Sequence, residues 1–453
     1  MSGNAANNYQ KSAGLVKSPL GGYVQFNTDS KFENMLLKII GQREFQRMRN
    51  IGQLGSVGNL YAGARNSRFE HCIGTGDLMG HMLLSADINK SISASEDFGW
   101  IAHCDRHYFK SQMSPDKEFD IEQQATITAA FLHDIGHTYP GHLFENAIQA
   151  VPIENYKNHE KWGIEIIRRS EIYNILNSYS AGFAERVIKI LSEDNLKNDV
   201  HQNILGGNLN ADTLDYIWRD QEITGFNAMF SQQLMIELIN GIRFIKIPTG
   251  GTGIALIDTI PEMLFTQMLS ARAELYQNVY YNSQHAAAWA FMPKFFKGIR
   301  AALDHPKYKS DIKNTNNPFV KFIESLGTDY DAYLKLDNYG FFQMMHSISS
   351  LGIPGLSDLA ERYTDPTAGF TGEEIYSGRS EYAPNKSYIS AQKQEVESQG
   401  GILDETIIPW YKPSKGEVYC IRGPNKFIKF SEQYKATANN KSVIISKFFM
   451  NEM

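Results

Sequence analysis

Residues 131–145 read Phe131-Leu132-His133-Asp134-Ile135-Gly136-His137-Thr138-Tyr139-Pro140-Gly141-His142-Leu143-Phe144-Glu145 and hold three of the 12 histidines of the chain. A mostly apolar run over 127–132 leads into this stretch, so we expect the polar cluster to lie at the end of a buried helix. Burial of ionisable side chains is unfavourable unless a partner compensates their charge. A His-Asp pair in such a place therefore predicts a bound metal ion.

Helical spacing prevails on both sides of this stretch. Ser67-Arg68-Phe69-Glu70 has the pattern of a capping box, which predicts a helix over about 68–88. Gly136 and Pro140 are expected to end the helix that begins near Ile121. Further helices are predicted over 31–40, 157–169, 184–191 and 212–222, as a pair over 261–303, and on to about 350.

Strand signals are few and lie mostly near the C-terminus. Alternation over 21–26 predicts a short strand, and the segments 417–421, 427–430 and 443–445 predict a small strand-containing unit. The polar, Gly-rich region 364–400 is interpreted as a connector, and 90–118 as an insertion. The predicted domains are a flexible tail (1–18), a helical core (19–303), a helical extension with a connector (304–400) and a small strand-containing unit (401–453).

The composition restricts partners and location. The net charge of −6 does not support nucleic acid as a partner. The three cysteines, Cys72, Cys104 and Cys420, have neither disulfide-framework nor zinc-site spacing, which suits a reducing cytosol. The polar N-terminus and the lack of any long apolar run predict no signal peptide and no membrane span. We therefore expect a cytoplasmic protein.

A metal at His133-Asp134 needs further ligands, and the sequence offers two candidates. His71 lies in the first turn of the helix that follows the capping box, and Asp212 opens a later helix. Two histidines and two aspartates form a mixed nitrogen and oxygen set. Such a set suits iron, manganese, zinc or magnesium without deciding between them. Any one of these histidines, taken alone, is more often a hydrogen-bonded core residue than a metal ligand.

In this order, His71, His133-Asp134 and Asp212 form the H…HD…D signature of the HD-domain metal-dependent phosphohydrolases, which the chain resembles. Residues 46–49, 53–55, 66–71, 133–137 and 214–220 also resemble the deoxynucleoside triphosphate triphosphohydrolases, a group with bacterial dGTPases and the mammalian SAM-and-HD-domain enzyme. The resemblance covers about residues 19–300. It implies a mainly α-helical HD-domain core with a small α+β C-terminal lobe. It also implies metal-dependent hydrolysis of deoxynucleoside triphosphates (dNTPs) to a deoxynucleoside and tripolyphosphate.

The resemblance further implies a role for each matching residue. The expected metal ligands are His71, His133, Asp134 and Asp212. The residues expected at the scissile phosphate, with acid–base and transition-state roles, are His137, His142, His159, Glu145 and Glu160. The expected substrate-binding residues are Arg68 and Arg272 at phosphate oxygens, Gln53 and Asp220 at the 3′-hydroxyl, Leu54 and Tyr280 beside the sugar, and Tyr216 and Tyr276 nearby.

Three positions depart from the family pattern. Thr213 stands where the family has a lysine after the last metal aspartate, and Tyr276 stands where a histidine is frequent. The preference for a triphosphate therefore stays open. Gly41 replaces an acidic residue of the activator site of the mammalian enzyme, so a guanine-specific activator is not expected. A homo-oligomer and a nucleotide activator remain expectations from the resemblance.

Two other functions stay open. A phosphohydrolase of the same fold can act on nucleoside mono- or diphosphates or another nucleotide, and the chain can also be a non-catalytic nucleotide sensor. The intact His/Asp set argues against a sensor. The stripe of Arg43, Arg47 and Arg49 fits either a solvated helix face or an anion site at a subunit interface.

Overall fold

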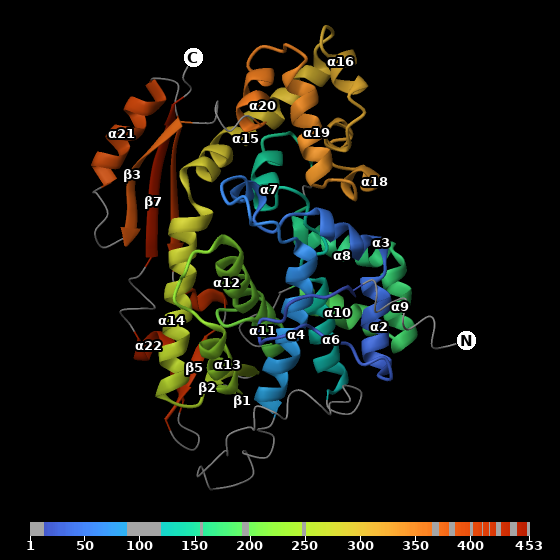
Figure 1. The fold of residues 1–453 in the computed structure, drawn as a ribbon, viewed down its shortest axis with the longest axis vertical. Coiled ribbons are helices and arrows are strands. Elements are labelled where there is room, and N and C mark those ends of the chain that lie inside the picture. Colours follow the sequence, from blue (N-terminus) through green and yellow to red (C-terminus); the bar gives the residue numbers. More distant parts are fainter. Residues whose placement is uncertain are drawn as a thin grey trace.

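The computed structural model describes residues 13–87, 119–154, 157–192, 199–246, 251–364, 371–379, 386–398, 402–409, 411–415, 417–422, 427–434 and 442–450. The predicted insertion at 90–118 and most of the predicted tail lie outside these residues. The described part is mainly helical with two small sheets, which confirms the predicted fold class (Figure 1). Within it, no helix is long and apolar enough to cross a membrane.

Short helices at the N-terminal side lead into the long helix α4 (Arg68–Asp87). They are α2 (Lys31–Ile40), α3 (Arg43–Gln46), and the 3₁₀ turns η1 (Arg47–Asn50) and η2 (Gly55–Asn59). The strand predicted over 21–26 is wrong: only an isolated bridge joins Lys17 to Tyr23. At the start of α4, the Glu70 carboxylate accepts from the Ser67 N–H at 2.8 Å. The Ser67 hydroxyl also donates to Glu70, so only half of the predicted capping box forms.

Helix α6 (Ile121–Leu132) is the central buried helix, and it packs against α4 (Figure 1). Asp120 and Gln123 form a full capping box at its start. The helix ends at Leu132 rather than at the predicted Ile135, so His133 is its C-cap. The surrounding helices are α7 (His142–Ile148), α8 (His159–Arg169), α9 (Glu171–Tyr179), α10 (Phe183–Leu191), α11 (Val200–Gly206), α12 (Ala211–Thr224) and α13 (Gln232–Asn240).

The predicted helix pair over 261–303 is confirmed as α14 (Thr259–Leu275) and α15 (Ser283–Asp304), joined by a π-helical turn, η5 (Tyr276–Tyr280). Helix α12 packs against both α4 and α14. It therefore lies between these two helices of the core. The helical extension consists of α16 (Lys309–Asn314), α17 (Pro318–Glu324), α18 (Tyr330–Tyr333), α19 (Asn338–Ser349) and α20 (Leu356–Thr364).

Strands from distant parts of the chain form the two sheets. The first has the order β1-β2-β5-β6 and consists of β1 (Ile242–Lys246), β2 (Thr252–Leu256), β5 (Val418–Ile421) and β6 (Phe427–Lys429). Each strand pairs only with its neighbours in this order. Strand β2 pairs with β5 in parallel, with Ile254 opposite Val418. The predicted strands at 417–421 and 427–430 thus exist, but they extend a sheet of the core.

The second sheet has the order β3-β7-β4, and both pairings are antiparallel. Its strands are β3 (Thr371–Arg379), β4 (Ile402–Pro409) and β7 (Ser442–Met450), and α15 and α21 (Lys386–Ser398) pack against it (Figure 1). The region 364–400, interpreted as a connector, therefore supplies a strand and a helix. The short elements η7 (Pro413–Lys415) and α22 (Phe430–Gln433) complete the described fold.

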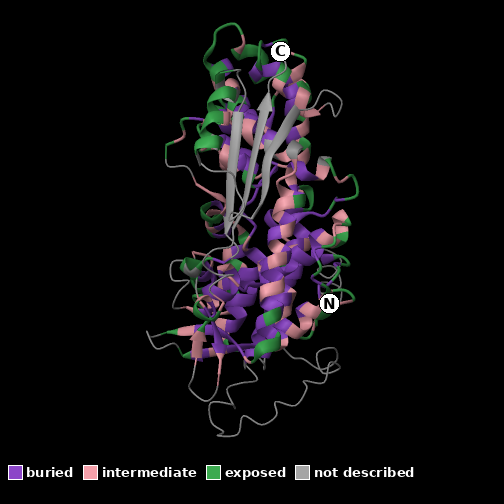
Figure 2. Cartoon of the chain, turned by 90° about the vertical axis from the view of Figure 1, so that its left-hand side faces the viewer, coloured by how far each residue is buried: buried purple, intermediate pink, exposed green. Residues whose placement is uncertain are grey.

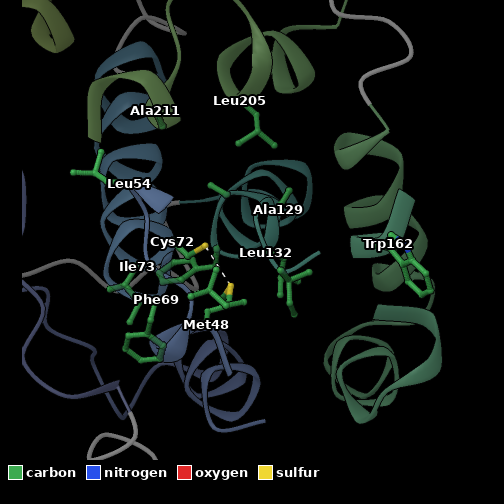
Figure 3. Close-up of a cluster of buried hydrophobic side chains, with 14 of the residues drawn as sticks. Met48, Leu54, Phe69, Cys72, Ile73, Ala129, Leu132, Trp162, Leu205 and Ala211 are labelled. Atoms are coloured by element: carbon green, nitrogen blue, oxygen red, sulfur yellow. Dashed lines mark hydrogen bonds between the residues drawn. The ribbon is translucent and has the colours of Figure 1, made fainter. Parts of the chain in front are cut away.

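The apolar core lies directly beneath the polar stretch that follows α6. Figure 3 shows Phe69, Cys72 and Ile73 from α4 beside Leu132 from α6, and all four are buried. Buried residues concentrate in the same helical part of the molecule in Figure 2. Because such a core is close-packed, it holds the ends of α4 and α6 in fixed positions.

Candidate metal centre and active site

A cavity of about 490 Å³ opens where α4, α6 and α12 meet η5 and residues 411–415. Every predicted site residue lines this cavity except His71 and Glu145. These two lie behind lining residues and contact them: His71 Nε2 is 3.2 Å from His133 Nε2, and Glu145 Oε2 is 2.8 Å from His142 Nδ1. The structure thus brings together residues that are more than two hundred positions apart.

The four predicted metal ligands converge at one end of the cavity. His71 Nε2 is 3.0 Å from Asp212 Oδ1, and His133 Nε2 is 3.5 Å from Asp134 Oδ1 and 3.7 Å from Asp212 Oδ1. Donors that sit about 2.1 Å from a shared ion lie roughly 3.0 to 3.4 Å from one another. The donor atoms are therefore close to the spacing that a divalent ion imposes, and this end of the site fits a metal.

The charge state of the cluster also suits a metal. Burial raises the pKa of Asp134, but the charges of Arg68, His133 and His71 together outweigh burial and hold that pKa well below its usual range. Hydrogen bonds from His133 and His71 do the same for the pKa of Asp212. Both carboxylates are thus ionised near neutral pH, the form that binds a cation. For His71, burial lowers the pKa, but hydrogen bonds to Asp212 and Asp215 raise it to about 10, so a metal that binds at Nε2 has to displace a proton.

Asp215 orients His71 from behind. Its Oδ2 accepts a hydrogen bond from His71 Nδ1 at 2.7 Å, and Arg219 donates to both carboxylate oxygens at 2.9 and 2.6 Å. Because this hydrogen bond holds His71 Nδ1, the Nε2 atom of His71 faces the other predicted ligands. Residues that hydrogen-bond to metal ligands commonly orient them in this way. The sequence offered a signal, since Asp212, Asp215 and Arg219 follow at helical spacing, but we predicted no role for Asp215 or Arg219.

A second group, of three histidines around Glu145, lies beside the metal ligands. Glu145 accepts from His142 Nδ1 and His159 Nδ1, each at 2.8 Å, and from the His159 N–H at 2.7 Å. Burial raises the pKa of Glu145, but these hydrogen bonds outweigh it and hold the pKa low. In His142 and His159, Nε2 is then the ring nitrogen that can contact a substrate. The His137 ring stacks on His159 at 3.8 Å between centroids.

His137 differs from its neighbours in burial and charge. Burial, reinforced by the charge of Arg68, holds the pKa of His137 well below its usual value, so the ring is neutral. Among the described residues its Nδ1 is buried without a hydrogen-bond partner, which is unusual for a buried polar atom and leaves it available. Glu160 lines the cavity but contacts Asn158, at 3.0 Å, instead of this histidine group.

The predicted sugar-binding residues form another part of the cavity wall. Tyr280 donates to Asp220 Oδ2 at 2.6 Å, and Asn66 Nδ2 lies 3.4 Å from Asp220 Oδ1. Burial raises the pKa of Asp220 to about 6. Gln53 Oε1 is buried without a partner, and Leu54 lies beside it in the cavity lining.

The predicted phosphate-binding arginines lie in different surroundings. Arg68 is buried and ion-paired to Asp134. Arg272 Nε donates to the Tyr216 hydroxyl at 2.9 Å, and its guanidinium lies 5.1 Å from the centroid of the Tyr276 ring. Both arginines line the cavity and supply positive charge to it.

Neither interpretation of the arginine stripe at 43–49 is correct for Arg47. Its side chain donates to the carbonyl oxygens of Ile135 and His137 at 3.0 and 2.7 Å. Tyr333 donates to the carbonyl of Gly136 at 2.6 Å. The turn that follows His133-Asp134 is therefore held by two side chains from distant elements. Because the pattern around Arg47 is locally amphipathic, nothing in it indicated this inward position.

Comparison with known proteins identifies a domain that carries part of this site. Residues 68–201 match the HD domain family. An uncharacterized protein of Bacillus subtilis, YwfO, is 25% identical over 62% of this chain and 54% of its own length. The deoxynucleoside triphosphate triphosphohydrolase SAMHD1 of Xenopus laevis is 27% identical over 33% of this chain and 20% of its own. The chain thus spans about half of the length of the first relative and a fifth of the second.

A solved structure has a similar fold over nearly the whole chain. It is described as a phosphohydrolase of Bacteroides thetaiotaomicron and matches with a TM-score of 0.65 and 17% identity, over 97% of this chain and 99% of that one. The chain therefore contains an HD domain, and the fold extends beyond it into the helical extension and the C-terminal strands. These findings support a metal-dependent hydrolase of the HD type.

Proposed function

We propose that this protein hydrolyses dNTPs to a deoxynucleoside and tripolyphosphate with a divalent metal. One observation carries the proposal: a single cavity joins the His/Asp cluster, the histidines around Glu145, the arginines and the Asp220–Tyr280 pair. A dNTP needs different groups along its length: a metal and histidines at the scissile phosphate, cations at the other phosphates, and hydrogen-bonding groups at the sugar. The local similarity to SAMHD1 adds support.

The cluster of His71, His133, Asp134 and Asp212 would hold the metal, which would supply Lewis acidity toward a phosphate oxygen. Hydrolysis at the α-phosphorus breaks its bond to the 5′-oxygen, and the proton that water loses ends on that oxygen. His142 is suited to deliver this proton because Glu145 holds its Nδ1 at 2.8 Å and its side chain is 61% exposed to the cavity mouth. Arg68 and Arg272 would stabilise negative charge on the phosphates.

The sugar wall supports a preference for a deoxyribose. Asp220 and Gln53 offer acceptor oxygens to a 3′-hydroxyl, and the Gln53 oxygen has no hydrogen-bond partner among the described residues. Leu54 and the Tyr280 ring add bulk beside them, which disfavours an additional hydroxyl on a ribose.

A second candidate is a nucleoside mono- or diphosphatase of the same fold. Thr213 favours it, because a shorter phosphate chain needs fewer cations than a triphosphate.

A panel of the four dNTPs and their ribonucleotides tests the proposal. Each is incubated with Mn²⁺ or Mg²⁺, with and without a second nucleotide, and the phosphate products are separated by chain length. Release of tripolyphosphate and a deoxynucleoside is the expected result. Release of inorganic phosphate or pyrophosphate alone contradicts the proposal and favours the second candidate. Loss of tripolyphosphate release in His133→Ala assigns the activity to this site.

A further inference from the structure

A segment of the C-terminal region lines the same cavity, although the HD domain ends more than two hundred positions earlier. Lys412 and Lys415 are among the residues that line it, together with Arg272, Asp212 and Thr213. Both lysines are exposed and lie in or beside the 3₁₀ turn η7. The sequence alone gave them no role, because they lie outside the part of the chain that resembles the triphosphohydrolases.

Two well-defined contacts hold this segment at the cavity. The Lys412 N–H donates to Asn208 Oδ1 at 2.9 Å, and Asn208 Nδ2 donates to the Lys412 carbonyl at 2.7 Å. Asn208 lies between α11 and α12, just before the metal ligand Asp212. The paired amide contacts thus tie the lysine backbone to the loop that leads into the metal centre.

Tyr411 anchors the segment from its other side. Its ring is buried between Phe265 of α14 and Phe430, with centroids 6.2 and 5.3 Å away. Its hydroxyl donates to Glu417 at 2.6 Å and accepts from the Val418 N–H at 2.9 Å. A buried anchor of this kind fixes the backbone, so the lysines are presented at the cavity by a rigid support.

The electrostatics of this end of the cavity suit an anion. The Lys412 and Lys415 ammonium groups have no hydrogen bond or ion pair within the described residues, and Arg272 is near. Burial, followed by the charges of Arg272 and Lys415, lowers the pKa of Lys412. Three cations held near one another repel, and an anion among them relieves that repulsion. The carboxylates of Asp134 and Asp212, which line the same cavity, suit a cation instead.

We propose that Lys412 and Lys415 bind the terminal phosphates of the dNTP, in place of the lysine that Thr213 replaces. The inference rests on the proposed function, because it requires a triphosphate that extends from the metal ligands past Arg272. The C-terminal segment would then make the site selective for long phosphate chains. The Asp220–Tyr280 wall binds the sugar end and is not affected.

The test compares Lys412→Ala, Lys415→Ala and the double variant with the wild type. Lys429→Ala is the matched control, because Lys429 is an exposed lysine of the same region that pairs with Glu432 at 3.9 Å outside the cavity. Steady-state kinetics give KM and kcat for a dNTP. Calorimetric titration with tripolyphosphate measures anion binding without turnover.

A charged hydrogen bond to phosphate contributes about a tenfold change in affinity, so each single variant should raise KM about tenfold and the double variant further. The affinity for tripolyphosphate should fall in parallel, with kcat and the affinity for orthophosphate nearly unchanged. Lys429→Ala should match the wild type. A double variant with wild-type KM and wild-type tripolyphosphate affinity overturns the inference.

The two proposals fail separately. If the wild type releases tripolyphosphate from dNTPs but the double variant binds it equally well, the lysine inference is wrong and the proposed function stands. If the wild type hydrolyses no dNTP, the proposed function is wrong. The titration still tests whether the two lysines bind phosphate, since unchanged tripolyphosphate affinity in the double variant refutes that role.

Discussion

Asp220 is a buried carboxyl group that destabilises the fold at neutral pH. Burial raises its pKa to about 6, whereas an aspartate in an unfolded chain titrates near about 3.9. Between these values the unfolded chain releases the proton while the folded chain keeps it. Folding therefore becomes less favourable as pH rises through this window, and the loss is complete above about pH 6. A residue with only a structural role would not be expected to keep such an arrangement.

We predict that Asp220→Asn is more stable than the wild type at pH 8. Two pKa units correspond to about 3 kcal/mol, an upper value because the amide changes the contact with Tyr280. The gain in the free energy of unfolding should shrink toward pH 4, where the wild-type Asp220 carboxyl is protonated and, like the amide of the variant, uncharged. Thermal unfolding of both proteins at several pH values measures the difference. Equal stability at every pH would show that the Asp220 pKa is unshifted.

Asp215 lies on the same helix as Asp220 but contacts the metal side. We predict that Asp215→Asn weakens metal binding about 10- to 100-fold, because it loosens the Nδ1 contact that orients His71. Titration of the metal-free protein with Mn²⁺ gives the dissociation constant. Asp220→Asn is the matched control, an equally small change on the same helix α12, and should bind the metal as the wild type does. An unchanged affinity for Mn²⁺ in Asp215→Asn would show that Asp215 does not support metal binding.

At the scale of elements, α14 is joined to the β5–β6 hairpin through one buried carboxylate. Glu262 is fully buried and accepts from both terminal nitrogens of Arg422 and from the Tyr434 hydroxyl at 2.8 Å. The hairpin lies next to residues 411–415, and Tyr411 contacts Phe430. This carboxylate therefore supports the position of the lysine segment as well as that of the hairpin.

We predict that Glu262→Gln costs about 2 to 3 kcal/mol locally, since a buried charged pair is broken while Arg422 keeps some contact with water. Hydrogen exchange should rise most in 411–434 and little in α4 and α6. Glu274→Gln, a partly exposed carboxylate on the same helix, should show no such change. Uniform destabilisation of the whole chain would mean that the hairpin does not open separately from the core.

At the scale of the molecule, the metal site links three elements that are distant in sequence. Its predicted ligands come from α4, the end of α6 and the start of α12. An ion that binds only the folded arrangement stabilises it, by about 4 kcal/mol at a concentration 1,000 times its dissociation constant. A chelator should therefore lower the unfolding temperature as well as abolish hydrolysis.

Calorimetry with and without Mn²⁺ after chelation measures this stabilisation. His133→Ala should unfold at one temperature in both conditions, because it lacks a ligand. His81→Ala, at a half-buried position of α4 that does not line the cavity, should respond as the wild type does. An unfolding temperature that is independent of metal in the wild type would contradict a site shared between elements.

The local patterns were enough to predict most helices and the candidate metal ligands, whereas the other site residues were expected only from the family resemblance. The periodicity over 121–132 and 261–303 depends only on residues within a few turns of each other, and the structure has helices there. The ordered signature of His71, His133-Asp134 and Asp212 likewise selected residues that the fold brings together. It could do so because each of these residues lies at or near a helix end, and local sequence predicts where helices begin and end.

What depends on distant partners could not be predicted in this way. The segment 21–26 alternates but finds no partner strand, whereas 371–379 becomes a strand because β7 pairs with it. The inward turn of Arg47 and the place of Lys412 at the cavity follow from contacts made across most of the chain.

By itself, then, the sequence determined the helices, the mainly α fold class and the candidate ligand set, because these arise from local periodicity and helix-end chemistry. Only the tertiary structure decided how the strands pair and how Asp215 supports His71. It also decided which cations face a substrate, because such contacts depend on packing between segments that no local pattern connects.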